Sequence, residues 1–112
     1  MILMPIVYVL EMDESVAFYE RLGFEVDIQS RSQHWTELKA GDGAVLALHS
    51  AEAGKAGRVE LSMVAEEPLE RLADVTSIAR GIADEAFGRS IILRDPNGLE
   101  IQVNEHDREL YA

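Results

Sequence analysis

Hydrophobic and polar positions in the first thirty residues follow three successive patterns. Residues 1–10 are mostly apolar and rich in branched side chains, which predicts a buried strand. Residues 13–22 carry apolar side chains at helical spacing, with Asp13 as the expected N-cap and Gly23 as the expected left-handed residue after the helix. Residues 24–29 then alternate strictly between apolar and polar side chains, which predicts a second strand.

The same order of elements is predicted twice along the chain. Strands are expected on both sides of Gly41-Asp42-Gly43, a sequence typical of a hairpin loop. Moving Gly43 forward by 55 positions gives Gly98, and moving Met4 forward by 56 gives Glu60, so the pattern repeats with half the chain length. Two interpretations follow: a pair of β-α-β-β-β modules, or an α+β sandwich without internal symmetry. The remaining predicted elements are strands at 34–40, 44–50 and 58–65, a helix from Pro68, a weak strand at 76–83, and strands at 89–94 and 99–105 around the turn Asp95-Pro96-Asn97-Gly98.

Composition narrows the class of protein. The chain has 112 residues, of which 47% are hydrophobic and 28% charged, as expected for one globular domain. It contains no cysteine, which excludes disulfides, thiolate zinc sites and cysteine nucleophiles. No apolar run is long enough to span a membrane, and residues 1–10 lack the features of a signal peptide. We therefore expect a cytoplasmic protein.

The charge balance is strongly acidic. There are 21 acidic and 10 basic side chains, which give a formal net charge of −11. The charge is spread over both halves without a basic patch, so nucleic-acid binding is not expected. An acidic protein attracts cationic small molecules, although such a balance also simply favours solubility. Glycine-rich phosphate loops of the GxGxxG and GxxxxGK types are absent from the sequence.

Two groups of motifs resemble the two modules of one known protein family. Its opening module is similar to three segments here: Val7-Tyr8-Val9, Asp13-Glu14-Ser15-Val16-Ala17-Phe18-Tyr19 and Leu22-Gly23-Phe24-Glu25-Val26. The closing hairpin of its second module is similar to two more: Phe87-Gly88-Arg89 and Leu93-Arg94-Asp95-Pro96-Asn97-Gly98-Leu99-Glu100-Ile101-Gln102-Val103. The family that these motifs resemble is the vicinal oxygen chelate superfamily of glyoxalase I, bleomycin-resistance proteins and extradiol dioxygenases, and the resemblance covers essentially the whole chain.

The resemblance implies a fold but not one function. It implies a single α+β domain over residues 1–112, with module one at about 1–53 and module two at about 57–112. The two βαβββ modules are then expected to form a U-shaped, partly open mixed sheet around a concave cleft. The superfamily includes isomerases, dioxygenases, thiol transferases and sequestering proteins, so function has to be argued from the residues of the site.

The family's metal ligands are not found at the matching positions. The expected histidine of the first strand aligns with Met4, and the glutamate of the fourth strand aligns with Ala47. The histidine that opens the second module aligns with Glu60, or less well with Val59, and the last glutamate aligns with Gln102. Only Glu60 is a good oxygen ligand for a divalent ion, and a site normally needs three or four ligands. We expect neither a metal nor another cofactor.

Strand alternation predicts which side chains line the cleft. A three-residue loop at 41–43 pairs Trp35 with His49 and Glu37 with Ala47, and Ala47 stands at a family ligand position. The expected ligand-binding residues are Met4, Tyr8, Trp35, Glu37, His49, Glu60 and Gln102, with Ile6 beside them. Among these, the candidates for catalytic proton transfer are Glu37, His49 and Glu60. Each has a structural alternative: Trp35 as a core or dimer contact, His49 as a cross-strand pair, and the glutamates as solvated strand residues.

The leading interpretation of function is metal-independent binding of an aromatic or cationic small molecule, in which Trp35 stacks and Glu37 or Glu60 pairs with charge. One alternative is a glyoxalase-like lyase or isomerase that uses Glu37, His49 or Glu60 to move protons. Another is an interaction module with an unused cleft. The expected partners are a small-molecule ligand and a second copy in a homodimer, with no nucleic acid and no membrane. The sequence leaves the ligand open.

Overall fold

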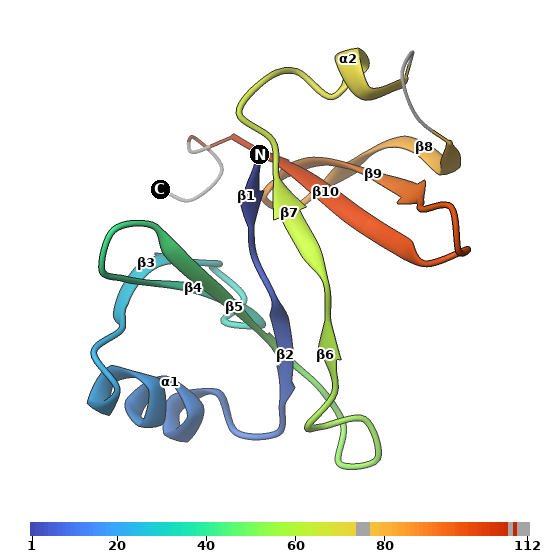
Figure 1. Ribbon diagram of the computed structural model, residues 1–112. Coiled ribbons are helices and arrows are strands. Elements are labelled where there is room, and N and C mark those ends of the chain that lie inside the picture. Colours follow the sequence, from blue (N-terminus) through green and yellow to red (C-terminus); the bar gives the residue numbers. More distant parts are fainter. Residues whose placement is uncertain (74–76, 108, 110–112) are drawn as a thin grey trace. The chain divides into compact units, whose positions relative to one another are not determined.

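The computed structural model describes residues 1–73, 77–107 and 109, and the chain divides into two compact units (Figure 1). The N-terminal unit is Met4–Glu60, and the C-terminal unit is Leu61–Ala112 together with Met1–Leu3. Each unit has a five-stranded sheet that mixes parallel and antiparallel pairs. Over the described ranges, no helix is both long enough and apolar enough to span a membrane.

The N-terminal unit is built as a β-α-β-β-β module with one added strand. Its sheet has the strand order β3-β4-β5-β2-β6, in which β2 runs parallel to β5 and the other neighbours are antiparallel. The elements are β2 (Ile6–Val9), α1 (Met12–Arg21), β3 (Glu25–Gln29), β4 (Trp35–Ala40), β5 (Ala44–Ser50) and β6 (Val59–Glu60).

The C-terminal unit repeats this plan. Its sheet has the order β1-β7-β10-β9-β8, with β7 parallel to β10 as β2 is to β5. The elements are β1 (Ile2–Leu3), β7 (Ser62–Val64), α2 (Glu70–Ala73), β8 (Ile78–Glu85), β9 (Gly88–Arg94) and β10 (Glu100–His106). The predicted α+β class and the doubled β-α-β-β-β order are therefore confirmed.

One face of each sheet packs against its own helix. In the N-terminal unit the buried residues Val9, Leu38 and Leu48 form a core against which Met12, Val16 and Tyr19 of α1 pack. In the C-terminal unit the core consists of Leu69, Ile91 and Val103, with Met63, Leu72 and Leu93 packed around it. Because side chains alternate along a strand, the residues between these core positions lie on the opposite face of each sheet.

The first helix and the first strand differ in detail from the sequence prediction. The predicted strand at 1–10 is split into β1 and β2 around Pro5, which has no N–H for a sheet hydrogen bond. The N-cap of α1 is Glu11 rather than Asp13, because the Glu11 carbonyl accepts from both the N–H and the hydroxyl of Ser15. Asp13 lies in the first turn, where its charge suits the helix N-terminus.

Two later elements also differ. The alternation of residues 24–29 is interrupted by a bulge between Val26 and Ile28, which turns Ile28 to lie opposite Glu37. The second helix begins at Glu70 rather than at Pro68, and the Leu69 N–H just before it donates to the Glu105 side chain of β10. The weak strand expected at 76–83 is β8, whose described part begins at Ile78, and Thr76 lies outside the described residues.

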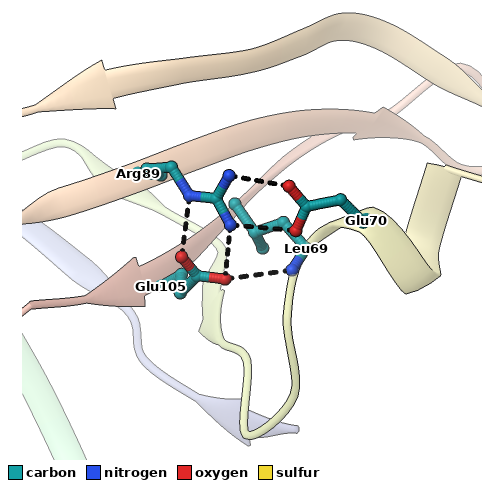
Figure 2. Close-up of polar contacts among 4 residues, drawn as sticks. All are labelled: Leu69, Glu70, Arg89 and Glu105. Carbon is teal, nitrogen blue, oxygen red and sulfur yellow. Dashed lines mark hydrogen bonds and ion pairs between the residues drawn. The ribbon is translucent and has the colours of Figure 1, made fainter.

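Arg89 ties α2 to the sheet of the C-terminal unit (Figure 2). Its guanidinium donates to Glu105 on β10 at 2.8 and 3.0 Å, and to Glu70 at the start of α2 at 2.7 and 2.9 Å. Glu105 also accepts from the Leu69 N–H at 3.1 Å. The hydrogen bonds to Arg89 lower the pKa of Glu70 from its ordinary 4.5 to about 2, and they lower the pKa of Glu105 as well.

We expect Arg89→Gln to lower the melting temperature at about pH 7, because two carboxylates lose their partner. Both carboxylate pKa values are lowered by folding, so this stabilisation is complete above about pH 4.5 and is lost as the pH falls toward 2. Calorimetry of both proteins should show a difference that narrows over this pH range. Arg94→Gln is the control, because its pair with Glu100 is exposed and 3.5 Å long. Equal effects of the two substitutions would contradict this account.

A second expectation concerns Gly88 at the start of β9. Its φ is +145°, and an added Cβ would clash with the Glu105 carbonyl oxygen. Gly88→Ala should therefore cost at least about 2 kcal/mol in the free energy of unfolding. Gly81→Ala, where an added Cβ meets nothing within 4 Å, should change it by about 0.5 kcal/mol or less. Urea unfolding of both variants tests the difference, and an equal free energy of unfolding for Gly88→Ala and the wild type would refute it.

Candidate functional site

Three ring-bearing side chains form a row across the N-terminal sheet, on the face opposite α1. Trp35 of β4 lies opposite His49 of β5, and His49 lies beside Tyr8 of β2. The ring centroids of Trp35 and His49 are 6.0 Å apart at nearly a right angle, and those of His49 and Tyr8 are 5.2 Å apart and tilted. We call Trp35, His49 and Tyr8 the aromatic row. The predicted pairing of Trp35 with His49 is confirmed.

A glutamate hydrogen-bonds to each end of this row. Glu37 lies opposite Ala47, as predicted, and the Trp35 indole N–H donates to its carboxylate at 2.8 Å. Glu60 lies across from Ile6, and its carboxylate is hydrogen-bonded to Tyr8. Glu37 is only 3% exposed, whereas the side chain of Glu60 is 45% exposed. The two carboxylates therefore differ in access to solvent, and Glu60 is the one open to a solute.

Arg58 completes the Tyr8 end of the row. Its guanidinium carbon lies 4.7 Å from the centroid of the Tyr8 ring, and one of its nitrogens lies 4.0 Å from Glu60. Burial and the hydrogen bond with Glu60 raise the pKa of Tyr8 to about 12, against the opposing positive charge of Arg58. The Tyr8 hydroxyl therefore keeps its proton at neutral pH and donates it to Glu60.

The imidazole of His49 contacts the backbone at the end of its own strand, β5. Its Nδ1 lies 2.6 Å from the backbone carbonyl oxygen of Ser50, and the side chain is half-buried. The Ser50 hydroxyl lies in turn 2.8 Å from Nδ1 of His34. The contact with the Ser50 carbonyl holds the imidazole of His49 between the rings of Tyr8 and Trp35.

The predicted site residues are distributed over both units. Tyr8, Trp35, Glu37, His49 and Glu60 come together on one face of the N-terminal sheet. The list of expected residues has two further members. Met4 is fully buried and precedes β2 in the chain, and Gln102 lies on β10 of the C-terminal unit, where its amide donates to Asn104 at 2.7 Å. The concave cleft that the resemblance implies stays a prediction.

Sequence reasoning missed Arg58 and Ser50. Arg58 reaches the site because its carbonyl accepts from the Tyr8 N–H at 2.9 Å, a pairing between segments fifty residues apart. Ser50 contributes through a backbone carbonyl, which every residue has. Neither contact has a signal in the local sequence pattern.

The equivalent face of the C-terminal sheet is polar rather than aromatic. Ser90 and Asn104 pair in the C-terminal sheet at the positions that Trp35 and His49 occupy in the N-terminal sheet. Val64 lies beside Asn104, at the position that corresponds to Tyr8. Ser90 and Asn104 are fully buried, and Ser90 is hydrogen-bonded to Arg80. The repeated fold therefore carries an aromatic row in one unit and a polar network in the other.

The residues at the family's ligand positions do not fit a divalent metal ion. Ala47 presents only a methyl group between Glu37 and Ile6, and Met4 offers a thioether, a soft donor that hard cations avoid. Among the described residues, no group of three or more His, Cys, Asp and Glu side chains is placed to hold a metal.

Comparison with known proteins gives structural neighbours only. No protein-family model and no curated protein sequence matches the chain. A member of the glyoxalase/bleomycin resistance protein/dioxygenase superfamily from Vibrio splendidus 12B01 is 21% identical, with 92% of this chain and 97% of that chain covered and a TM-score of 0.57. An uncharacterized protein from Methanosarcina mazei is 18% identical over 96% and 94% of the two chains, with a TM-score of 0.60.

A third solved structure, that of an NAD-dependent benzaldehyde dehydrogenase from Legionella pneumophila, is 18% identical over 94% of this chain and 99% of that chain, with a TM-score of 0.64. Identities this low carry information about fold and not about activity. The folds of these solved structures agree with the two β-α-β-β-β modules and with the sequence motifs of the opening and closing segments. The chain has the vicinal oxygen chelate fold, that of the glyoxalase/bleomycin resistance protein/dioxygenase superfamily.

Proposed function

We propose that this protein binds a planar aromatic small molecule on the aromatic row, without the help of a metal ion. The observation that supports the proposal most is the unbroken contact of Trp35, His49 and Tyr8 across three strands, with a carboxylate at each end. Rings placed side by side offer π surface to a flat ligand. On this face Trp35 is 8% exposed, whereas Tyr8 and His49 are half-buried, so Tyr8 and His49 supply most of the accessible ring surface.

Charge favours a cationic member of that ligand class. Glu60 is exposed beside Tyr8, and the chain as a whole has a formal charge of −11. A positive group over Tyr8 or His49 gains cation–π attraction as well as pairing with Glu60. Arg58 occupies part of this position in the free protein, and its 4.0 Å separation from Glu60 is long for an ion pair. An incoming cation therefore competes with a weakly held guanidinium.

The lyase or isomerase alternative requires a group that accepts a proton from a bound molecule. Glu37 is nearly fully buried and accepts the indole N–H of Trp35. His49 and Glu60 are the more accessible proton acceptors of the row. Binding requires only the geometry described above, and for this reason it is the function we propose. The homodimer and the cytoplasmic location expected from the sequence stay predictions.

The binding proposal predicts that 1-methylquinolinium, a planar aromatic cation, binds more tightly than the anion naphthalene-2-sulfonate. Addition of the cation should shift the backbone amide signals of β2, β4 and β5 and the indole N–H signal of Trp35, the sole tryptophan. Binding should weaken with added salt as the charge pairing is screened. A two-dimensional NMR titration measures this, and the absence of shifts with both probes would refute the proposal.

Two variants locate this binding. His49→Ala should lower the affinity for the cation by roughly threefold or more, because the central ring of the row is removed. Glu60→Gln should weaken it by roughly two- to fivefold and flatten the salt dependence. His34→Ala is the matched control, since His34 is exposed and lies outside the aromatic row. Equal losses in the His34 and His49 variants would contradict binding on the row.

Metal independence has its own test. After expression in medium supplemented with zinc, nickel, manganese and iron, followed by dialysis, elemental analysis should find far less than one metal ion per chain. The reason is the donor set, in which Ala47 and Met4 replace the ligands that a hard cation requires. Stoichiometric metal that survives dialysis would contradict this part of the proposal.

A further inference from the structure

The strongest hydrogen-bond donors of the aromatic row are already used inside the protein. The indole N–H of Trp35 donates to Glu37 at 2.8 Å, and the Tyr8 hydroxyl is hydrogen-bonded to Glu60. Nδ1 of His49 lies 2.6 Å from the carbonyl oxygen of Ser50. A carbonyl oxygen accepts and cannot donate, so the proton in this last contact belongs to the imidazole.

This contact determines the tautomer of His49. A neutral imidazole has one N–H, and the Ser50 carbonyl places it on Nδ1. Nε2 then carries a lone pair and acts as a hydrogen-bond acceptor. Within the described part of the chain, no side chain or backbone group donates to His49 Nε2. The acceptor therefore stands unused, on a half-buried ring between Tyr8 and Trp35.

The exposed carboxylate beside the row is also a hydrogen-bond acceptor. Glu60 is an acceptor, and its side chain is 45% exposed. Arg58 is the donor-bearing side chain nearby, but its guanidinium lies over the Tyr8 ring at the β6 end and faces Glu60. At the centre of the row the described residues offer π faces and the lone pair of His49, because the indole N–H of Trp35 and the imidazole N–H of His49 are already paired.

We propose that the ligand is an aromatic molecule with an N–H or O–H on its edge, and that it donates this hydrogen to His49 Nε2. The inference rests on the proposed function, because it names the class of ligand for the same surface. His49 is then the residue that determines specificity. A flat neutral ligand without a donor on its edge, such as 1-methylindole, faces the lone pair of Nε2 and leaves it unpaired.

The tautomer can be observed directly in the free protein. Long-range proton–nitrogen NMR spectra of the His49 ring at about pH 8, where imidazoles in general are neutral, should show the proton on Nδ1 and a bare Nε2. The opposite tautomer would remove the acceptor and overturn the inference, whatever the protein binds.

Three related probes test the ligand class. Indole carries a ring N–H, 1-methylindole replaces it by a methyl group, and 2-methylindole carries the same extra methyl group but keeps the N–H. Indole and 2-methylindole should bind roughly three- to tenfold more tightly than 1-methylindole, as expected for one net hydrogen bond. Amide NMR titration at about pH 8 gives the three dissociation constants.

His49→Phe is the decisive variant, because phenylalanine keeps a ring in the row and removes the acceptor. The three probes should then bind with nearly equal affinity, close to that of 1-methylindole for the wild type. His34→Phe is the matched control at an exposed position outside the row and should preserve the discrimination. The chemical shifts of the core methyl groups of Leu38 and Leu48 report whether each variant remains folded.

The outcomes separate the two proposals. Equal binding of all three probes to the wild type overturns the donor inference and leaves the binding function standing. Discrimination that persists in His49→Phe assigns the acceptor to another group and also overturns it. Binding of neither these probes nor 1-methylquinolinium overturns the proposed function, and the inference falls with it.

Discussion

The pairing of β4 with β5 is the constraint on which the rest of the candidate site depends. The three-residue loop Gly41-Asp42-Gly43 fixes this register, with φ values of 56° and 121° at its two glycines. Because side chains alternate along a strand, a one-residue slip of either strand would bring His49 or Glu37 under α1 and turn Leu48 or Leu38 away from the core. Burial of the leucines therefore specifies the aromatic row on the other face.

Once the register is fixed, the polar chemistry of the row follows from the demand that buried polar groups be paired. The indole of Trp35 and the carboxylate of Glu37 satisfy one another within one strand. Tyr8 finds its acceptor in Glu60, across the sheet on β6. His49, with a backbone carbonyl as its partner, keeps one nitrogen for chemistry outside the protein. Structural pairing and ligand recognition thus use different atoms of the same side chains.

The sequence predicts what alternation and glycine conformation control. The bounds of β5, the loop at Gly41-Asp42-Gly43 and the pairing of Trp35 with His49 all come from local patterns. The sequence prediction fails where a contact depends on a residue far away along the chain. The Leu69 N–H just before α2 is paired with Glu105, thirty-six residues later, and the cation–π contact of Tyr8 depends on Arg58. The bulge before Ile28 also leaves the apolar alternation unchanged, so the pattern alone does not reveal it.

The central claim is that a ligand with a donor on its edge lies on the aromatic row. Intermolecular NMR contacts between bound indole and the protein test this most directly, because they locate the ligand without a substitution. The account predicts contacts from the indole ring to the ring protons of Tyr8, His49 and Trp35, with the indole N–H nearest His49. Contacts confined to α1 and the core methyl groups of Leu38 and Leu48, or to the C-terminal unit, would contradict it.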